Sequence, residues 1–180
     1  MDRYVAFLRG MNLGNRRIKN EELRGEFVEL GLEAISCFRA SGNVIFAAEK
    51  EDEAKLARRI ETGLGKSLGY EVPVFLRDAA ALRGIAAYEP FDAPFLAASK
   101  GKLQVALLLE PPSRAARDRA LAFGSDDDRL AIEGRELYWL PSGGMSESEL
   151  DLKAIGAELG QTTIRTKGTI DQIAAKHFAD

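Results

Sequence analysis

The stretch YVAFL, residues 4–8, is apolar throughout and decides the fold. Successive side chains of a strand point to opposite faces of its sheet, so an apolar run without alternation is typical of a strand that is covered on both faces. Arg9 and Gly10 end the run, and a polar loop follows over residues 11–19. The start of the chain therefore predicts a buried strand and a loop that leads into a helix.

The next segments predict two helices and three further strands. Leu23, Phe27 and Leu30 share one face of a helix for which Asn20 is the expected N-cap. Pro73 cannot donate a ladder hydrogen bond, so its strand is expected at a sheet edge. The predicted elements are a helix over 20–30, strands over 34–39 and 44–47 joined by a turn at 40–43, a helix over 51–66 and a strand over 72–76.

The order strand, helix, strand, strand, helix, strand is the ferredoxin-like βαββαβ pattern. It predicts an antiparallel sheet with strand order 4-1-3-2, in which the strand with Pro73 lies at an edge. The helices can cover only one face of a sheet that is apolar on both, so the rest of the chain is expected to pack on the other face. We therefore predict an α+β protein with a ferredoxin-like subdomain at 1–78 and a smaller α+β subdomain at 79–180.

The second half is predicted to contain a helix, a strand, a helix, a two-stranded hairpin and two more helices. Its centre repeats the element order of the first half, without a repeat at the level of residues. Ser146 and Glu149 form one S-x-x-E capping box, and Thr169 with Gln172 forms another. The predicted ranges are 78–88, 103–109, 111–123, 129–133, 136–140, 146–159 and the terminal helix from 169.

Composition limits the function classes that remain. The 180 residues include 25 Lys+Arg and 28 Asp+Glu, and no apolar run approaches the roughly 18 residues of a membrane-spanning helix. Cys37 is the single cysteine and cannot form an internal disulfide, so a cytoplasmic protein is expected. With His177 as the single histidine, a zinc site of His and Cys ligands lacks donors. We expect no metal and no cofactor, and whether the protein is an enzyme stays open.

The loop over residues 9–19 is the first candidate for a binding site. It follows a strand and opens a helix, so backbone N–H groups and the positive end of the helix dipole point out of it. Gly10 and Gly14 permit positive φ, which lets N–H groups converge on an anion, and the loop carries four cations. The alternative is a solvated turn whose arginines pair with Glu21 and Glu22.

The predicted topology brings a second turn beside this loop. The first and third strands are expected to be antiparallel neighbours, so the end of one lies beside the start of the other. Convergent polar groups are a default binding-site hypothesis. We predict a site for a small phosphate-bearing anion, with Arg9 as clamp and Asn12 or Asn43 orienting the ligand. Its predicted residues in this half are Arg9, Gly10, Asn12, Gly14, Ser41, Gly42 and Asn43.

Four segments resemble the bacterial family catalogued as domain of unknown function 1697. They are YVAFLRGMNLGN (4–15), IKNEEL (18–23), ASGNVIF (40–46) and GYEVPVFLR (69–77). The elements R-G-[IM]-N-x-G and S-G-N-V are the most specific parts of the resemblance. It implies a small two-part protein with a ferredoxin-like N-terminal region, and it implies no particular reaction.

A C-terminal element of that family resembles T-x-R-N-W-x-T. Residues 163–169 of this chain match it at Arg165 and Thr169, while Thr166 and Lys167 replace the usual Asn and Trp. Through this resemblance Arg165 joins the predicted ligand-binding residues. A simpler interpretation is that Thr169 caps the last helix and the rest is a solvated turn.

Two other classes of function compete with a small-anion site. A nucleic-acid-binding module of the RRM type shares the ferredoxin-like topology, but residues 43–48 lack its paired aromatics and the pI is 5.4. A protein-interaction module whose polar loops hold no ligand fits the sequence as well as the anion site does. A membrane partner is not expected.

Overall fold

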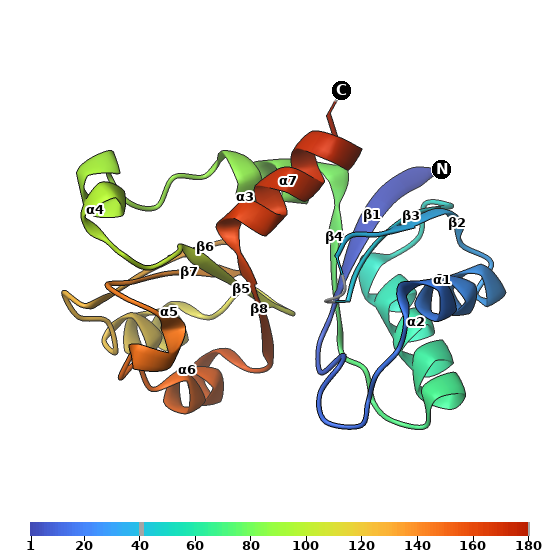
Figure 1. The fold of residues 1–180 in the computed structure, drawn as a ribbon, viewed down its shortest axis with the longest axis horizontal. Coiled ribbons are helices and arrows are strands. Elements are labelled where there is room, and N and C mark those ends of the chain that lie inside the picture. Colours follow the sequence, from blue (N-terminus) through green and yellow to red (C-terminus); the bar gives the residue numbers. More distant parts are fainter. Residues whose placement is uncertain (40–41, 180) are drawn as a thin grey trace. The chain divides into compact units, whose positions relative to one another are not determined.

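In the computed structural model, which describes residues 1–39 and 42–179, the YVAFL stretch forms β1, Asp2–Leu8 (Figure 1). β1 pairs antiparallel with β3 (Asn43–Ala48) on one side and with β4 (Val74–Asp78) on the other. β2 (Glu33–Cys37) pairs with the free side of β3. The strand order β2-β3-β1-β4 is 4-1-3-2 counted from the β4 edge, and Pro73 directly precedes that edge strand.

The chain divides into two compact units. The first unit contains Met1–Arg83 together with the C-terminal residues from Ile173 onward, and the second contains Gly84–Gln172. The boundaries lie within α3 (Ala79–Ala87) and α7 (Lys167–His177), so the chain passes between the units inside these two helices. None of the helices in the described part of the chain is long and apolar enough to cross a membrane.

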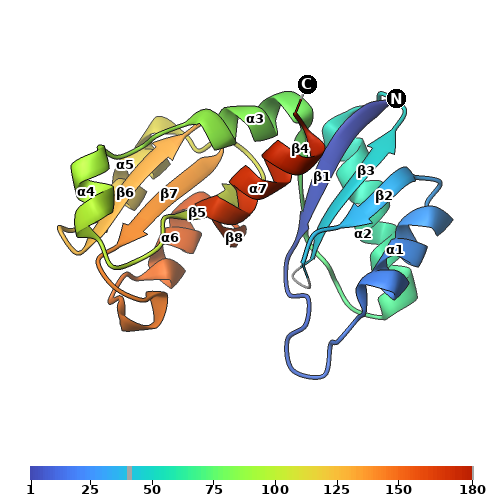
Figure 2. The ribbon, with the colours of Figure 1, turned by 45° about the horizontal axis from the view of Figure 1, so that its top comes forward.

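The core of the first unit lies between its sheet and the helices α1 (Asn20–Glu29) and α2 (Glu53–Leu68). Figure 2 shows both helices on the same side of the sheet. Burial of apolar surface is the main force that holds these layers together. The cluster includes Tyr4, Ala6 and Leu8 of β1, Val44 and Phe46 of β3, Leu23 and Phe27 of α1, and Leu56, Ile60 and Leu64 of α2.

The opposite face of this sheet is also buried. Val5, Phe7 and Ile45 have no exposed surface. C-terminal residues of the same unit contact nearby groups: the ring of Phe178 lies 5.7 Å from the guanidinium carbon of Arg3, which alternates onto the same side of β1 as Val5 and Phe7. The two-sided burial predicted from YVAFL is therefore present.

The helix starts show where local prediction was wrong. The N-cap of α1 is Lys19, one residue before the predicted Asn20, and Glu22 Oε2 accepts a hydrogen bond from the Lys19 N–H at 3.0 Å. The Asn20 amide instead donates to the carbonyl of Arg39 at 3.1 Å. Neighbouring polar residues differ little in the free energy that each would gain as the N-cap of a helix. The contact of the Asn20 side chain with the Arg39 carbonyl therefore decides which residue caps α1.

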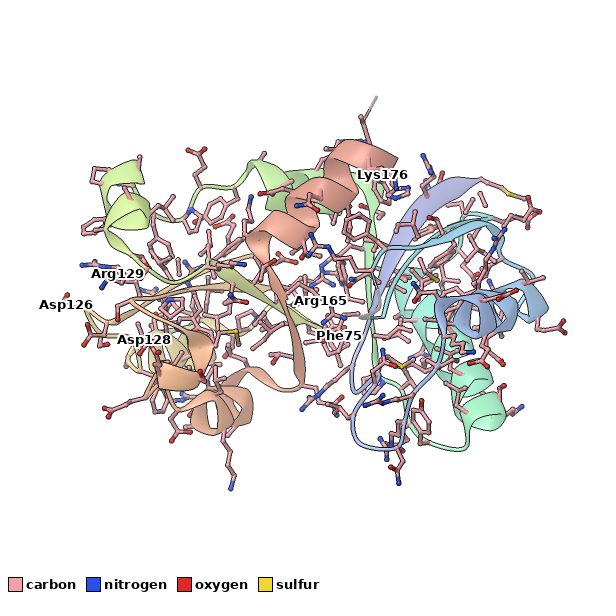
Figure 3. The ribbon with its side chains drawn as sticks, viewed as in Figure 1. Phe75, Asp126, Asp128, Arg129, Arg165 and Lys176 are labelled. Carbon is pink, nitrogen blue, oxygen red and sulfur yellow. The ribbon has the colours of Figure 1, made fainter. Side chains whose placement is uncertain are left out.

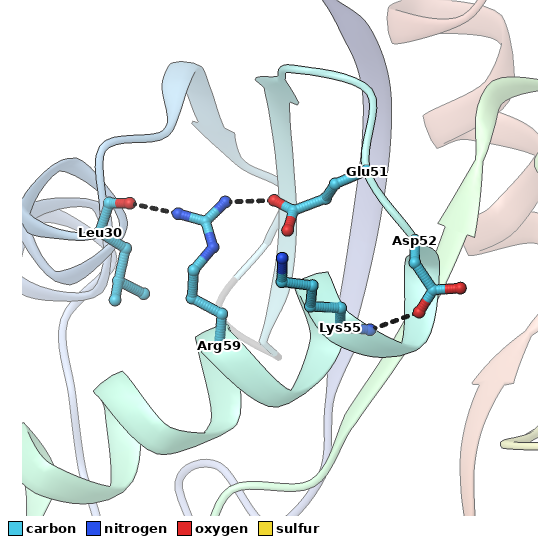
Figure 4. A network of polar contacts seen from close by, with 5 residues as sticks. All are labelled: Leu30, Glu51, Asp52, Lys55 and Arg59. Carbon is cyan, nitrogen blue, oxygen red and sulfur yellow. Dashed lines mark hydrogen bonds and ion pairs between the residues drawn. The ribbon is translucent and has the colours of Figure 1, made fainter.

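An arginine ties the two helices of the first unit together (Figure 4). Arg59 of α2 donates from Nη1 to the carbonyl of Leu30 at 2.7 Å and from Nη2 to Glu51 Oε1 at 2.6 Å. Leu30 is the C-cap of α1, so the guanidinium satisfies a carbonyl that the helix leaves without an internal partner. The contact links the end of α1 with the segment that precedes α2.

The second unit has the same order of elements and the same strand order as the first. Its antiparallel sheet runs β6-β7-β5-β8. Helices α5 and α6 pack on the cluster that contains Ala106, Leu108 and Ile132. The elements are β5 (Gln104–Leu108), α5 (Arg114–Leu121), β6 (Asp128–Glu133), β7 (Glu136–Pro141), α6 (Leu152–Leu159) and β8 (Thr162–Thr166), preceded by α4 (Ala93–Ala98).

β8 was missing from the sequence prediction, and both predicted capping boxes were wrong. Thr162–Thr166 is rich in β-branched residues, which favour strands, and it forms a strand where the sequence analysis expects a solvated turn. Asp151, not Ser146, caps α6, because its Oδ1 accepts from the Ala154 N–H at 2.9 Å. Thr166 Oγ1 accepts from the Thr169 N–H at 3.2 Å, so Thr169 lies inside α7.

A buried carboxylate anchors the start of β6. Asp128 (labelled in Figure 3) is 6% exposed, and its Oδ1 accepts from Trp139 Nε1 at 2.7 Å and from Ser148 Oγ at 2.6 Å. Burial of a carboxylate is costly unless it is hydrogen-bonded. These two bonds therefore fix the β6-β7 pair and the segment that leads to α6.

We expect Arg59→Met to lower the free energy of unfolding by about 1–2 kcal/mol, because it removes one charge-assisted hydrogen bond and one half-exposed ion pair. Arg58→Met, at the neighbouring exposed position, is the matched control and should change it by less than about 0.5 kcal/mol. Urea denaturation followed by circular dichroism measures both. Equal losses in the two variants would show that the Leu30 and Glu51 contacts contribute nothing.

Candidate functional site

Three connections meet at one end of the first unit's sheet. They are the loop 9–19 after β1, the turn between β2 and β3, and residues 69–73 before β4. β1 is antiparallel to both neighbours, so its end lies beside the start of each. The Leu8 N–H donates to the Gly42 carbonyl at 2.8 Å, and the Arg9 N–H donates to the Pro73 carbonyl at 3.0 Å. We call this region the loop end of the sheet.

Gly42 brings the two predicted parts of the site into contact. A Cβ atom there would lie 2.9 Å from Met11 Cγ and 3.1 Å from Leu8 Cβ, and the backbone has φ +71°. L-residues with a side chain rarely adopt that conformation. Only glycine fits both constraints, and Met11 of the loop is buried against the turn. The closeness predicted for Gly42 and the end of β1 is therefore present.

The loop after β1 is held by left-handed residues and by one side chain. Gly10, Asn12 and Gly14 have φ of +74°, +60° and +56°. Asn12 Oδ1 accepts a hydrogen bond from the Ile18 N–H at 3.3 Å. Asparagine tolerates the left-handed region better than most residues, so this position suits it. Asn12 thus closes the loop across six residues.

Asn43 closes the turn between β2 and β3. Its side chain is 1% exposed and donates from Nδ2 to the carbonyl of Phe38 at 3.0 Å, while the Phe38 N–H donates to the Asn43 carbonyl at 2.9 Å. This contact gives Asn43 a role in holding the turn, and a role in orienting a ligand stays a prediction. Ser41, which was predicted beside it, lies outside the described residues.

Arginines surround the loop end. Arg9 and Arg17 are exposed, and the guanidinium carbon of Arg16 lies 4.5 Å from the centre of the Tyr70 ring, which links the loop to the connection before β4. Such cation–π contacts hold a guanidinium in one orientation. Arg39 is exposed, has φ +58° and lies 5.6 Å from the Phe38 ring.

Arg39 was not among the predicted site residues. The predicted strand ran through residue 39, whereas β2 ends at Cys37, so Arg39 belongs to the turn. The A-S-G-N sequence that follows it was the available signal, because residues next to a tight turn leave the strand. The hydrogen bond from Asn20 to the Arg39 carbonyl then places this turn beside the start of α1.

The start of α1 is less open to an anion than the sequence indicated. Glu21 and Glu22 lie in its first turn, and Glu22 occupies the Lys19 N–H. Carboxylates at a helix N-terminus offset the positive end of the dipole. Attraction of an anion to the loop end therefore depends on the arginine side chains rather than on the helix.

Arg165 and Lys167 belong to the second unit and are engaged there. Arg165 of β8 (Figure 3) donates from Nη1 to Thr163 Oγ1 at 2.8 Å and to the Ile164 carbonyl at 2.9 Å, and burial lowers its pKa to about 10. Lys167 donates to Asp171 at 2.6 Å and to the Ala86 carbonyl at 2.7 Å. Both cations therefore stabilise β8 and the start of α7.

With this geometry established, comparison with known proteins places the chain. The family described as "Protein of unknown function (DUF1697)" matches residues 1–138. The chain belongs to this family. The match confirms the resemblance seen in the segments around β1, β3 and β4, which form the loop end.

One solved structure extends the likeness over both units. The structure of the conserved bacterial protein SP0830 from Streptococcus pneumoniae is similar to this chain with a TM-score of 0.71 and 20% identity, and the match covers 97% of each chain. At that identity the likeness concerns the fold alone. No curated protein matches the chain.

We expect Gly42→Ala to destabilise the protein more than Gly10→Ala does. Both positions require positive φ, which costs alanine about 1–2 kcal/mol. At Gly42 crowding by Leu8 and Met11 should add about 1–3 kcal/mol, whereas nothing lies within 4 Å of a Cβ at Gly10. Urea denaturation of the two variants measures the difference. An equal loss would contradict the close packing between turn and loop.

Proposed function

We propose that the loop end binds a small anionic ligand that carries phosphate. The observation that supports this most is the packing of Gly42 on Met11 and Leu8, which unites a cation-bearing loop and a cation-bearing turn from distant parts of the sequence. Cations that converge on one end of a sheet attract anions and raise their local concentration. The cations are Arg9, Arg16, Arg17, Lys19 and Arg39.

The residue types suit phosphate. A guanidinium presents paired N–H groups that match two phosphate oxygens, and such charge-assisted bonds are shorter and stronger than neutral ones. The guanidinium carbon of Arg16 lies 4.5 Å from the centre of the Tyr70 ring, and this contact holds the cation at the loop end. We assign Arg9 as the main clamp because it directly follows β1 and its backbone is fixed: the Leu8 N–H donates to the Gly42 carbonyl, and the Arg9 N–H donates to the Pro73 carbonyl.

Binding without covalent chemistry is the simplest form of this function. Cys37 carries the single thiol of the sequence, and its Sγ donates to the carbonyl of Asn20 at 3.5 Å. Burial raises the pKa of this thiol, with a smaller opposing effect from Arg24, so it remains protonated near neutral pH. A protonated thiol is a poor nucleophile.

We propose the cytoplasm as the location of the protein. Its single cysteine is free and half-buried, and free cysteines are typical of proteins in the reducing cytoplasm.

A nucleic-acid partner is the second candidate. The strand order of the first unit supports assigning it to the ferredoxin-like class, which RNA-binding modules share. Those modules stack bases on the sheet face opposite the helices. Here Val5, Phe7 and Ile45 on that face are fully buried, which favours a small ligand at the sheet end over a base-stacking platform.

Isothermal titration calorimetry with pyrophosphate, ATP and a short single-stranded RNA tests the proposal. We expect the wild type to bind at least one phosphate compound, and Arg9→Ala to weaken binding about tenfold or more, because one charge-assisted contact is lost. Arg58→Ala, an exposed arginine on α2 away from the loop end, is the charge-matched control and should bind like the wild type.

Three outcomes separate the candidates. Tight binding of RNA with weak binding of ATP and pyrophosphate would favour the nucleic-acid function. No binding of any compound would leave a protein-interaction module as the better interpretation. An equal loss in Arg9→Ala and Arg58→Ala would indicate attraction by overall charge and would refute a site at the loop end.

A further inference from the structure

A polar cavity of about 440 Å³ lies in the second unit, where β6 begins and β7 ends. Residues of the segment 125–128 form its first wall, and residues of the segment 141–149, which leads to α6, form its second wall. Both segments belong to the second unit. The volume is within the range of small-molecule sites, so the cavity can hold a small organic ligand.

Hydrogen bonds hold the two walls in place. Ser125 Oγ accepts from the N–H groups of Asp127 and Asp128 at 3.2 Å and 3.1 Å, which fixes the first wall. The Ser142 N–H donates to the Asp127 carbonyl at 2.7 Å, and Ser148 Oγ donates to Asp128 Oδ1 at 2.6 Å. These last two bonds join the first wall to the second. The cavity is therefore bounded by segments that are tied to one another.

The ionisable side chains of the lining are all acidic. Four carboxylates line the cavity, and none of the described residues in its walls is a lysine, an arginine or a histidine. One carboxylate is partly engaged, because Glu147 Oε2 accepts from the Gly144 N–H at 3.3 Å. Exposed acidic residues are common on protein surfaces, so this charge alone does not identify a site. The four carboxylates are those of Asp127, Asp128, Glu147 and Glu149.

Asp128 (Figure 3) distinguishes this cavity from an ordinary acidic surface. The residue is more than nine-tenths buried, and its side-chain hydrogen bonds to described residues, from Trp139 and Ser148, both end on Oδ1. Oδ2 thus has no donor among the described residues. Solvent reaches Oδ2, because in the described part of the chain His177 Nε2 is the one buried side-chain polar atom without a partner. Since Asp128 lines the cavity, Oδ2 opens into it.

The carboxylate of Asp128 also lacks a counterion in the described chain. Its sequence neighbour Arg129 pairs with Asp126 instead, at 3.6 Å, and no other described cation forms an ion pair with Asp128. Burial of a carboxylate is costly, and aspartates that are almost fully buried are normally paired. A positively charged ligand that donates a hydrogen bond to Oδ2 would supply this missing partner.

The arrangement of the carboxylates favours an extended organic cation over a metal ion. The described residues contain no group of three His, Cys, Asp or Glu side chains that could hold a metal ion. The carboxylates are divided between the two walls, so two positive groups joined by a carbon chain can pair with both walls. Pro141 adds an apolar ring to the lining, which suits such a chain.

We propose that this cavity binds a linear aliphatic diamine or polyamine. One ammonium group donates to Asp128 Oδ2, and a second ammonium group pairs with the carboxylates of the second wall, which Ser148 joins to Asp128. The ligand's methylene groups lie along Pro141. The site lies in the second unit and is independent of the anion site proposed at the loop end.

A thermal-shift screen with 1,4-diaminobutane, 1,5-diaminopentane and spermidine at constant ionic strength tests the proposal, because a ligand that binds the native state stabilises it. We expect at least one of them to raise the melting temperature and to bind in calorimetry. 1-Aminobutane, which has the same chain and one charge fewer, should bind about tenfold more weakly than 1,4-diaminobutane. No binding of any diamine or polyamine, equal binding of 1-aminobutane, or a larger shift with CaCl₂ or MgCl₂ would overturn the proposal.

Variants assign the binding to this cavity. Asp128→Asn keeps an oxygen that can accept from Trp139 and Ser148 and replaces Oδ2 with an NH₂ group. It should therefore weaken diamine binding about tenfold or more, with little change in the melting temperature of the unliganded protein. Glu149→Gln, at an exposed position of the second wall, should weaken binding about three- to tenfold.

Glu133→Gln is the charge-matched control. Glu133 is exposed at the opposite end of β6, so its substitution should leave the affinity unchanged. Unchanged affinity in Asp128→Asn, or an equal loss in Glu133→Gln, would refute the site. If Asp128→Asn unfolds the protein, the exposed Glu149→Gln decides, and unchanged affinity in that variant would refute the site as well.

Discussion

The pairing of β1 with antiparallel neighbours on both sides is the constraint on which the first unit depends. β1 is buried on both faces, so neither its register nor its direction can change without exposing apolar side chains. The pairs Val5↔Ile45 and Val5↔Arg77 fix β3 and β4 relative to it. Because of this pairing, three connections meet at one end of the sheet: the loop 9–19, the turn between β2 and β3, and residues 69–73. At the other end, the start of β1 lies beside the end of β4. The proposed anion site follows from this pairing.

The two ends of this sheet differ in charge for a simple reason. At the loop end, the connections carry arginines, and the nearby carboxylates Glu21 and Glu22 lie in the first turn of α1. At the other end, acidic residues flank the starts of α2 and α3, where helix dipoles favour them, and arginines enter from β1 and α3. The two ends of one sheet therefore differ in the charged residues that they carry.

The second unit shows that the topology alone does not make the site. Its Leu108 N–H donates to the Arg135 carbonyl at 2.9 Å, which repeats the bond from Leu8 to Gly42 at the corresponding place. Yet the connection that follows, residues 109–113, has the sequence LEPPS and contains no arginine, lysine or glycine. The same fold therefore supports the cationic loop in one unit only, and function depends on the content of the loops.

The sequence by itself determined the segment order, the edge position of β4 and the two-sided burial of β1, because these depend on local apolar patterns and on one proline. It also indicated that the loop after β1 meets the turn before β3. Local signals for β8 and for the turn at Arg39 were present in the sequence, in the β-branched residues of 162–166 and in the A-S-G-N run. Only the tertiary structure decided the cap at Lys19 and the burial of His177 Nε2 without a hydrogen-bond partner among the described residues. Such features depend on contacts between residues far apart in the chain, or on small differences in free energy between neighbouring candidates for an N-cap. Neither cause leaves a periodic pattern in the sequence.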